Sequence, residues 1–164
     1  MDEIRIKPYD PKYKDQIVKL FEDFYDYLVE IDPLRKLIRQ PGYGENTTEQ
    51  TLKDVTEKEG VFYVALDGDK VVGFTVGTIR RPTPEDLLGA EPSVNGRVTE
   101  LYVDKDYRGK GLATKLMEKV EQTLKEKGCD YIWVEVFAPN QPPRSLYQKL
   151  GYIERDIDMI KKIS

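Results

Sequence analysis

The chain has 164 residues and a net charge of −4, with 34% charged and 39% hydrophobic residues. This length predicts one domain over residues 1–164 with a core of its own, and the negative charge argues against a non-specific nucleic-acid binder. No apolar run is long enough to span a bilayer, no basic and then apolar segment begins the chain, and a lone cysteine cannot form an internal disulfide. We therefore expect a cytoplasmic protein that binds neither membranes nor nucleic acid.

The sequence contains no histidine. Serine–histidine and cysteine–histidine nucleophilic machinery is therefore excluded, together with metal sites built on imidazole. Any general base must be a carboxylate, a tyrosine, a lysine, a cysteine or a chain of waters. We expect no metal in the functional site.

The beginning of the chain predicts a strand and then a helix. Residues 3–7 alternate in polarity, which is typical of a short strand. Asp10 followed by a proline predicts a helix start, and a stripe of apolar residues continues that helix to Asp32. Tyr25 and Tyr27 lie on this helix; packing is the favoured interpretation of both, with contact to a substrate as the alternative.

The next segment predicts a connection and a second helix. Residues 34–39 favour a short helical turn, and residues 41–44 are rich in glycine and proline, which is typical of a loop. The four residues 47–50 resemble a capping box. They predict a helix that ends near Glu59, with a glycine as its stop.

A hairpin follows. Residues 61–66 and 70–80 predict two strands, joined by the Asp-Gly-Asp sequence of residues 67–69. A cation site at these aspartates is the weaker interpretation, because the other ligands of a calcium loop are missing. Residues 81–96 contain three prolines and several carboxylates, and they predict a surface loop, with an approach to a cationic ligand as the alternative.

The centre of the chain predicts a strand, a tight turn and a helix. Residues 97–103 have the β-branched, aromatic and apolar side chains that strands favour, and residues 104–108 are polar. Apolar residues then recur at helical spacing from Leu112 to Leu124. Lysines and glutamates occupy the face of this helix opposite that apolar stripe.

The join between this strand and this helix has an unusual composition. No serine, threonine or asparagine stands where a helix cap is expected, so the first N–H groups of the helix lack a side-chain partner. Gly109 and Gly111 allow another molecule to approach the backbone closely. Arg108 and Lys110 add positive charge to the positive end of the helix dipole. The turn therefore predicts a cradle for a diphosphate.

The last quarter predicts a strand, a short helix and a final strand. Residues 131–137 are strongly β-prone, and prolines at positions 142 and 143 fit the first turn of a short helix, with Gly151 after its last turn. Residues 153–163 are predicted to form a final strand. Cys129 is interpreted as a small packing residue rather than a reactive thiol.

Two motifs decide among diphosphate sites. A P-loop requires Ser or Thr after Gly-Lys, and a dinucleotide fingerprint requires a third glycine where Thr114 stands. The Arg-x-x-Gly-x-Ala pattern at Arg108, Gly111 and Ala113, directly after Glu-Leu-Tyr-Val-Asp, instead resembles the pyrophosphate loop of the GNAT superfamily of acyl-CoA-dependent N-acyltransferases. The later Asn140, with Leu-Tyr-x-x-x-Gly-Tyr ending at residue 152, is similar to a second segment of the same family. An ordinary glycine-containing turn is the alternative.

The resemblance implies an α/β (α+β) fold. Its mixed, largely antiparallel sheet is flanked by helices in the order β-α-α-β-β-β-α-β-α-β. It also implies acetyl-CoA as co-substrate, a primary amine as acceptor, and a possible homodimer. The segment between the first two helices would help to form the acceptor pocket.

The resemblance also assigns roles to residues. Glu100 would be the general base, with Tyr102 and Glu135 as weaker candidates, and Tyr147 would be the general acid for the leaving thiolate. Asn140 would bind the pantetheine arm near the thioester. The backbone of the strand would bind the rest of the arm and the turn would bind the pyrophosphate, through Leu101, Tyr102, Val103, Arg108, Gly109, Lys110, Gly111, Leu112, Ala113 and Thr114. The amine would attack directly in a ternary complex, without an acyl-enzyme.

Two other functions remain open from the sequence. A non-catalytic acyl-CoA-binding or sensing domain would keep the same motifs. A protein that binds ADP or NAD through the diphosphate cradle would keep the turn alone. Fold by itself does not choose among them.

Overall fold

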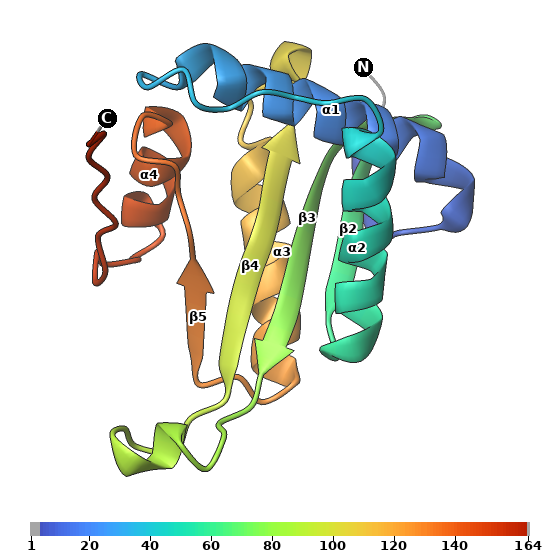
Figure 1. Cartoon of the computed structure of the whole chain (residues 1–164). Helices are drawn as coiled ribbons and strands as arrows, with labels where there is room; N and C mark the ends of the chain where they lie inside the picture. Colours follow the sequence, from blue (N-terminus) through green and yellow to red (C-terminus); the bar gives the residue numbers. More distant parts are fainter. Residues whose placement is uncertain (1–3, 164) are drawn as a thin grey trace.

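The computed structural model describes residues 4–163 and shows one five-stranded sheet with helices on both faces (Figure 1). The strands lie in the order β1-β2-β3-β4-β5, with β1 to β4 antiparallel to their neighbours and β5 parallel to β4. The strands are β1 (Arg5–Pro8), β2 (Val61–Asp67), β3 (Lys70–Arg80), β4 (Asn95–Val103) and β5 (Tyr131–Val134). The helices are α1 (Lys14–Ile31), α2 (Tyr43–Glu57), α3 (Leu112–Glu126) and α4 (Gln141–Lys149). The predicted fold class is confirmed.

The core consists of two layers of side chains, one on each face of the sheet. On one face, Ile17 and Phe21 of α1 pack against Phe62 of β2 and Phe74 of β3. On the other face, Leu116 of α3 packs with side chains of β2, β3 and β4. Figure 1 shows α3 behind the sheet and α2 in front of it. Because both faces are covered, β3 is buried along almost its whole length, as the long apolar run in its sequence requires.

The hairpin between β2 and β3 has the predicted form. Asp67 pairs with Lys70, so that two residues make the turn, and Gly68 has a φ of 60°. A positive φ is the conformation that such tight hairpin turns require and that glycine adopts without strain.

The first two helices begin differently from the prediction. Asp10 does accept a hydrogen bond from the Lys12 N–H, but it caps a 3₁₀ turn (Pro11–Tyr13), and α1 begins after it. Helix α2 begins at Tyr43, four residues before the predicted capping box. The packing explains this, because a Cβ added at Gly44 would lie 2.7 Å from the Val18 carbonyl oxygen of α1. The glycine permits the two helices to touch there, and this contact selects the helix start.

The predicted helical turn at residues 34–39 is wrong. The carboxylate of Asp32 accepts hydrogen bonds from the backbone N–H groups of Leu34, Lys36 and Leu37. These N–H groups therefore bond to a side chain instead of to carbonyls of a helix. The three bonds also hold the pKa of Asp32 below its usual range, with the bond from Leu37 as the largest cause.

The predicted strand at residues 153–163 is also wrong, since no strand follows α4 in the described part of the chain. The apolar residues of this segment are exposed, with Met159 93% and Ile163 91% accessible. The beginning of the segment is held by side chains: Arg144 donates to Glu154, and the guanidinium of Arg155 lies over the ring of Trp133. A strand needs a ladder of backbone hydrogen bonds to a neighbouring strand, and this segment pairs with none of the described strands.

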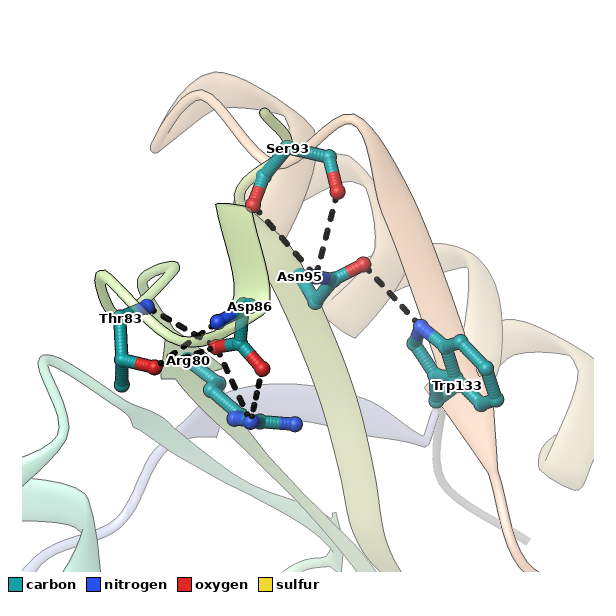
Figure 2. Close-up of polar contacts among 6 residues, drawn as sticks. All are labelled: Arg80, Thr83, Asp86, Ser93, Asn95 and Trp133. Atoms are coloured by element: carbon teal, nitrogen blue, oxygen red, sulfur yellow. Dashed lines mark hydrogen bonds and ion pairs between the residues drawn. The ribbon is translucent and has the colours of Figure 1, made fainter. Parts of the chain in front are cut away.

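The loop between β3 and β4 lies at one end of the sheet (Figure 1). The turn that contains Gly109 and Gly111, called the glycine turn below, follows the other end of β4. Figure 2 shows that Asp86 organises the loop between β3 and β4, by accepting hydrogen bonds from Arg80 and from both the backbone N–H and the hydroxyl of Thr83. Beside it, Asn95 accepts a hydrogen bond from the Trp133 indole N–H. The surface-loop interpretation is confirmed, and Asp86 bonds within the loop.

Within residues 4–163, no helix combines the length and the apolarity that crossing a bilayer requires.

Candidate active site

Strand β4 contains a bulge at the centre of the candidate site. Glu100 pairs with Val76 of β3 and Val98 pairs with Gly77, so Thr99 is an extra residue in the register, and its hydroxyl donates to the Val76 carbonyl oxygen. The Thr75 hydroxyl donates to the backbone carbonyl of Glu100 and fixes the strand there. A bulge redirects the side chains that follow it. Here it directs Glu100 to the face of the sheet that α2 covers.

The edge of β4 is open beyond the bulge. Pairing with β5 runs only from Asn95 to Val98, so among the described residues no strand pairs with Leu101, Tyr102 or Val103 on that side. In Figure 1, β4 continues upward past the tip of β5. An open edge offers N–H and C=O groups to an extended ligand, in the way that a strand would be added.

The turn after β4 has the backbone of an anion site. Gly109 and Gly111 have φ values of 74° and 78°, and Gly111 is the residue that caps α3. No side chain of residues 4–163 accepts a hydrogen bond from this helix start, and a Cβ added at Gly111 would meet no other described atom within 4 Å. The first-turn N–H groups of this 15-residue helix therefore have no side-chain cap among the described residues. This arrangement fits a diphosphate group, as the sequence predicts.

The two basic residues of the turn are held by its own backbone. The Nε of Arg108 donates to the Val103 carbonyl oxygen at 2.9 Å, and its guanidinium lies 5.2 Å from the ring centre of Tyr27 and 5.5 Å from that of Tyr102. Lys110 donates from Nζ to the Asp106 carbonyl oxygen. Both charges thus remain beside the positive end of α3, where an anion is favoured.

Glu100 is half-buried, and burial raises its pKa to about 7. Its side chain lines a cavity of about 220 Å³ between α2 and the sheet. Five neutral or acidic polar residues of α2 form one wall of this cavity, and none of its lining residues is basic. The lining residues are Asn46, Thr47, Gln50, Thr51, Asp54, Val76, Thr99 and Glu100.

Tyr147 lies on α4 and is 8% exposed. Burial, and then the negative charge of Glu100, raise its pKa to about 12, so its hydroxyl stays protonated at neutral pH. The electrostatic effect of Glu100 means that the fold brings these two residues, 47 positions apart, into one region. A carboxyl that titrates near neutrality and a hydroxyl that keeps its proton are suited to opposite directions of proton transfer.

Asn140 stands at the start of α4 but does not cap it, since no described side chain makes a cap hydrogen bond there. Its Oδ1 instead accepts a hydrogen bond from the Tyr27 hydroxyl at 3.1 Å. Asn140 is 8% exposed, so its amide is committed to the interior between α1 and α4.

The weaker candidates for the base have other environments. Glu135 is 78% exposed in its side chain and forms a 2.6 Å ion pair with Arg97. Tyr102 is buried beneath Arg108, and burial raises the pKa of its hydroxyl, which disfavours loss of the proton. Of the three, Glu100 has the environment that suits a base at neutral pH.

Sequence reasoning missed Tyr43. It lies in the first turn of α2, with its ring 4.1 Å from that of Tyr25, and burial raises its pKa, with the charge of Glu100 as a smaller contribution. The sequence assigns this residue to a loop because two glycines surround it. Only the helix start that packing selects brings it towards Glu100.

The model of the acetyltransferase (GNAT) family matches residues 15–152. The chain belongs to this family. It is 30% identical to N-alpha-acetyltransferase 30 of Schizosaccharomyces pombe over 92 residues, and this matched stretch covers 55% of each chain. It is also 32% identical to an uncharacterized N-acetyltransferase of Methanocaldococcus jannaschii over 97 residues, and this stretch covers 58% of this chain and 54% of that one. The chain thus spans about half the length of these curated relatives.

Solved structures of low sequence identity share the fold. A tetramutant of the BH1408 protein from Bacillus halodurans superposes with a TM-score of 0.84 at 18% identity, covering 97% of this chain and 99% of that one. AAC(6')-Iy, solved with the bisubstrate analog CoA-S-monomethyl-acetylneamine, superposes with a TM-score of 0.69 at 18% identity, covering 98% and 99%. In the part of the chain that the structure describes, no cluster of three His, Cys, Asp or Glu residues could hold a metal ion.

Proposed function

We propose that this protein is an acetyl-CoA-dependent N-acetyltransferase whose acceptor is a primary amine. The observation that carries the proposal is the position of Glu100. It lies at a bulge, lines a polar cavity on one side, and immediately precedes the open edge of β4 that leads to the glycine turn. The proposed base, the proposed track for an extended ligand and the proposed anion cradle would therefore occupy consecutive parts of one strand and turn.

Acetyl-CoA would be held by the residues that the sequence predicts. The N–H groups from Gly109 to Thr114 would bind the pyrophosphate, with Arg108 and Lys110 beside it, and the edge of β4 from Leu101 to Val103 would bind the pantetheine arm. The chemistry that acetyl-CoA supplies when bound is an activated acyl group on a thiolate leaving group. The remaining work of the site is to orient the amine and to move two protons.

Glu100 would remove the proton of the incoming ammonium, directly or through a water. A carboxylate of ordinary pKa near 4.3 is a poor base for an amine, and a pKa of about 7 improves the match. Tyr147 would give its proton to the departing thiolate, whose ordinary pKa is about 8.5. The raised pKa of Tyr147 keeps this proton available at every pH at which the enzyme would work.

The acceptor would enter through the cavity between α2 and β4. Its lining contains the carboxylate of Glu100, the carboxylate of Asp54, which pairs with Lys58 at 3.2 Å, and no basic residue. This lining favours a cationic amine over one that carries a phosphate or carboxylate near the nitrogen. The relative named N-alpha-acetyltransferase 30 suggests the α-amine of a protein as one acceptor, and the acetylneamine analog seen with AAC(6')-Iy suggests an aminoglycoside as another.

Two measurements test the proposal. Thermal shift with acetyl-CoA, ATP and NAD should rank acetyl-CoA first, whereas a larger shift with ATP or NAD would indicate a nucleotide-binding protein. Thiol release from acetyl-CoA with pooled amines and peptides should then show turnover that is lost in Glu100→Gln and kept in Glu135→Gln. Binding of acetyl-CoA without thiol release for any pool would instead favour a non-catalytic acyl-CoA-binding domain.

A further inference from the structure

We propose that Tyr27 is a positioning residue that sets the orientation of the Asn140 amide, so that the Asn140 Nδ2 donates to the pantetheine arm of acetyl-CoA. This inference rests on the proposed function, and it adds a residue that the motifs of the sequence do not contain. It starts from a hydrogen bond between two side chains that are 113 positions apart.

The first observation is an asparagine that does not cap its helix. Asparagine at a helix N-cap normally accepts a hydrogen bond from an N–H group of the first turn, and this cap contributes about 1 kcal/mol. At α4 the second and third helical residues are Pro142 and Pro143, which have no N–H to donate, so the Asn140 side chain cannot cap the helix and accepts from the Tyr27 hydroxyl instead. Because Asn140 is 8% exposed, its amide is held inside the protein by this contact rather than by its own helix.

The second observation concerns the groups of the Asn140 amide that remain after it accepts this hydrogen bond. A tyrosine hydroxyl that donates to Oδ1 occupies the acceptor side of the amide. The two N–H groups of Nδ2 then remain as donors. The pantetheine arm contains amide carbonyls, which accept hydrogen bonds. In the observed orientation the amide offers its donors to the arm, and the hydrogen bond from the Tyr27 hydroxyl to Oδ1 stabilises that orientation.

The third observation is the firm placement of Tyr27 itself. Helix α1 is anchored by Phe21 in the core and by Phe24, whose ring lies 5.4 Å from that of Tyr102 on β4. Tyr27 follows Phe24 by three residues, and so lies on the same side of the helix. Its ring also lies under the guanidinium of Arg108. Tyr27 thus contacts both the glycine-turn region and the start of α4.

The two contacts of Tyr27 predict different results for different ligands. If the residue acts through Asn140, loss of its hydroxyl should weaken the binding of the arm and leave the binding of the diphosphate unchanged. If it acts through Arg108, the diphosphate should be affected instead. The variant Tyr27→Phe removes the hydroxyl and keeps the ring beneath Arg108. The matched control is Tyr25→Phe, on the same helix two residues away.

The experiment measures dissociation constants by calorimetry for acetyl-CoA and for 3′-phosphorylated ADP, which carries the diphosphate without the arm. We expect Tyr27→Phe to weaken acetyl-CoA about three- to tenfold, as the loss of one hydrogen bond does, and to leave 3′-phosphorylated ADP within twofold. Tyr25→Phe should change neither. In an Asn140→Ala background, Tyr27→Phe should have no further effect on acetyl-CoA.

Each other outcome has a definite meaning. Unchanged acetyl-CoA affinity in Tyr27→Phe, equal weakening of both ligands, or a full additional loss in the Asn140→Ala background would overturn the role of Tyr27 and leave the proposed function standing. Failure of the wild-type protein to bind acetyl-CoA would overturn both proposals. Circular dichroism and melting curves of the variants show whether each is folded before its affinity is compared.

Discussion

The glycine turn after β4 and the proposed acid–base pair of Glu100 and Tyr147 would obtain their chemistry in different ways. The turn offers backbone N–H groups at a helix start, and it needs from its side chains mainly that Gly109 and Gly111 have none. The acid–base region depends on the surroundings of two side chains, Glu100 and Tyr147, which come from elements far apart in the chain. A site formed by backbone groups can be predicted from a short motif, whereas a site that depends on shifted pKa values of side chains depends on the whole fold.

The sharpest test of the acid–base region is Glu100→Gln. This change keeps the shape of the side chain and removes the base, so we expect kcat at pH 7 to fall by about 10²- to 10⁴-fold. The loss should diminish as the pH approaches the pKa of the amine. That pKa is ordinarily about 8 for an α-amine and about 10.4 for a lysine-like amine, so we expect recovery near pH 8 for the first and only above pH 9 for the second. The measurement is a pH profile of turnover. Parallel profiles with little loss at any pH would show that Glu100 is a structural carboxylate.

Tyr147→Phe should have the next largest effect. Departure as an unprotonated thiolate costs only about 2 kcal/mol at pH 7, because the thiol pKa is near 8.5. We therefore expect kcat to fall by roughly 10²-fold, towards the low end for acid–base groups, with little change in the affinity for acetyl-CoA. Tyr152→Phe, which alters the neighbouring ring, is the control. A wild-type kcat in Tyr147→Phe would remove the role of general acid.

The backbone site is tested by Gly111→Val against Gly128→Val. Both glycines have a positive φ and open space beside them, so each substitution should cost about 1–3 kcal/mol of stability from backbone strain. Only the change at Gly111 should also weaken acetyl-CoA, by at least about tenfold, because its side chain would project where the pyrophosphate approaches. Equal affinities of the two folded variants would exclude the glycine turn as the diphosphate site.

The burial of Glu100 also predicts how stability depends on pH. Because its folded-state pKa of about 7 lies above the ordinary 4.3, the folded protein binds more protons than the unfolded chain between these values. Its contribution to the free energy of unfolding therefore falls as the pH rises from about 4.3 to about 7, by at most roughly 4 kcal/mol. Urea unfolding at pH 5 and pH 8 should show this fall in the wild type and a smaller one in Glu100→Gln. Equal falls in the two proteins would show that Glu100 titrates normally.

The smallest effect is expected from removal of residues 157–163. The apolar side chains of this segment are exposed and it forms no strand. Its removal should change the free energy of unfolding by less than about 0.5 kcal/mol, as changes at exposed sites usually do. A loss of several kcal/mol would mean that the segment pairs with the sheet in solution.

Much of the fold could be predicted from the sequence, because its elements are specified locally. Strand β3 has the predicted bounds, since a tight Asp-Gly turn and a continuous apolar run leave little freedom. The wrong predictions fall where a side chain replaced a local pattern, as Asp32 does for the N–H groups after α1, or where a strand lacked a partner, as at residues 153–163. The start of α2 depends on contact with α1 at Gly44 and could not be read locally.

The same division applies to the candidate site. The sequence by itself determined the glycine turn, because the left-handed conformation and the absence of a capping side chain are properties of the residues at those positions. Only the tertiary structure decided that Glu100 titrates near neutrality, that Tyr43 turns towards it, and that Tyr27 holds Asn140. Desolvation and the proximity of charges depend on which elements pack together. A linear motif records the residue types but not their surroundings.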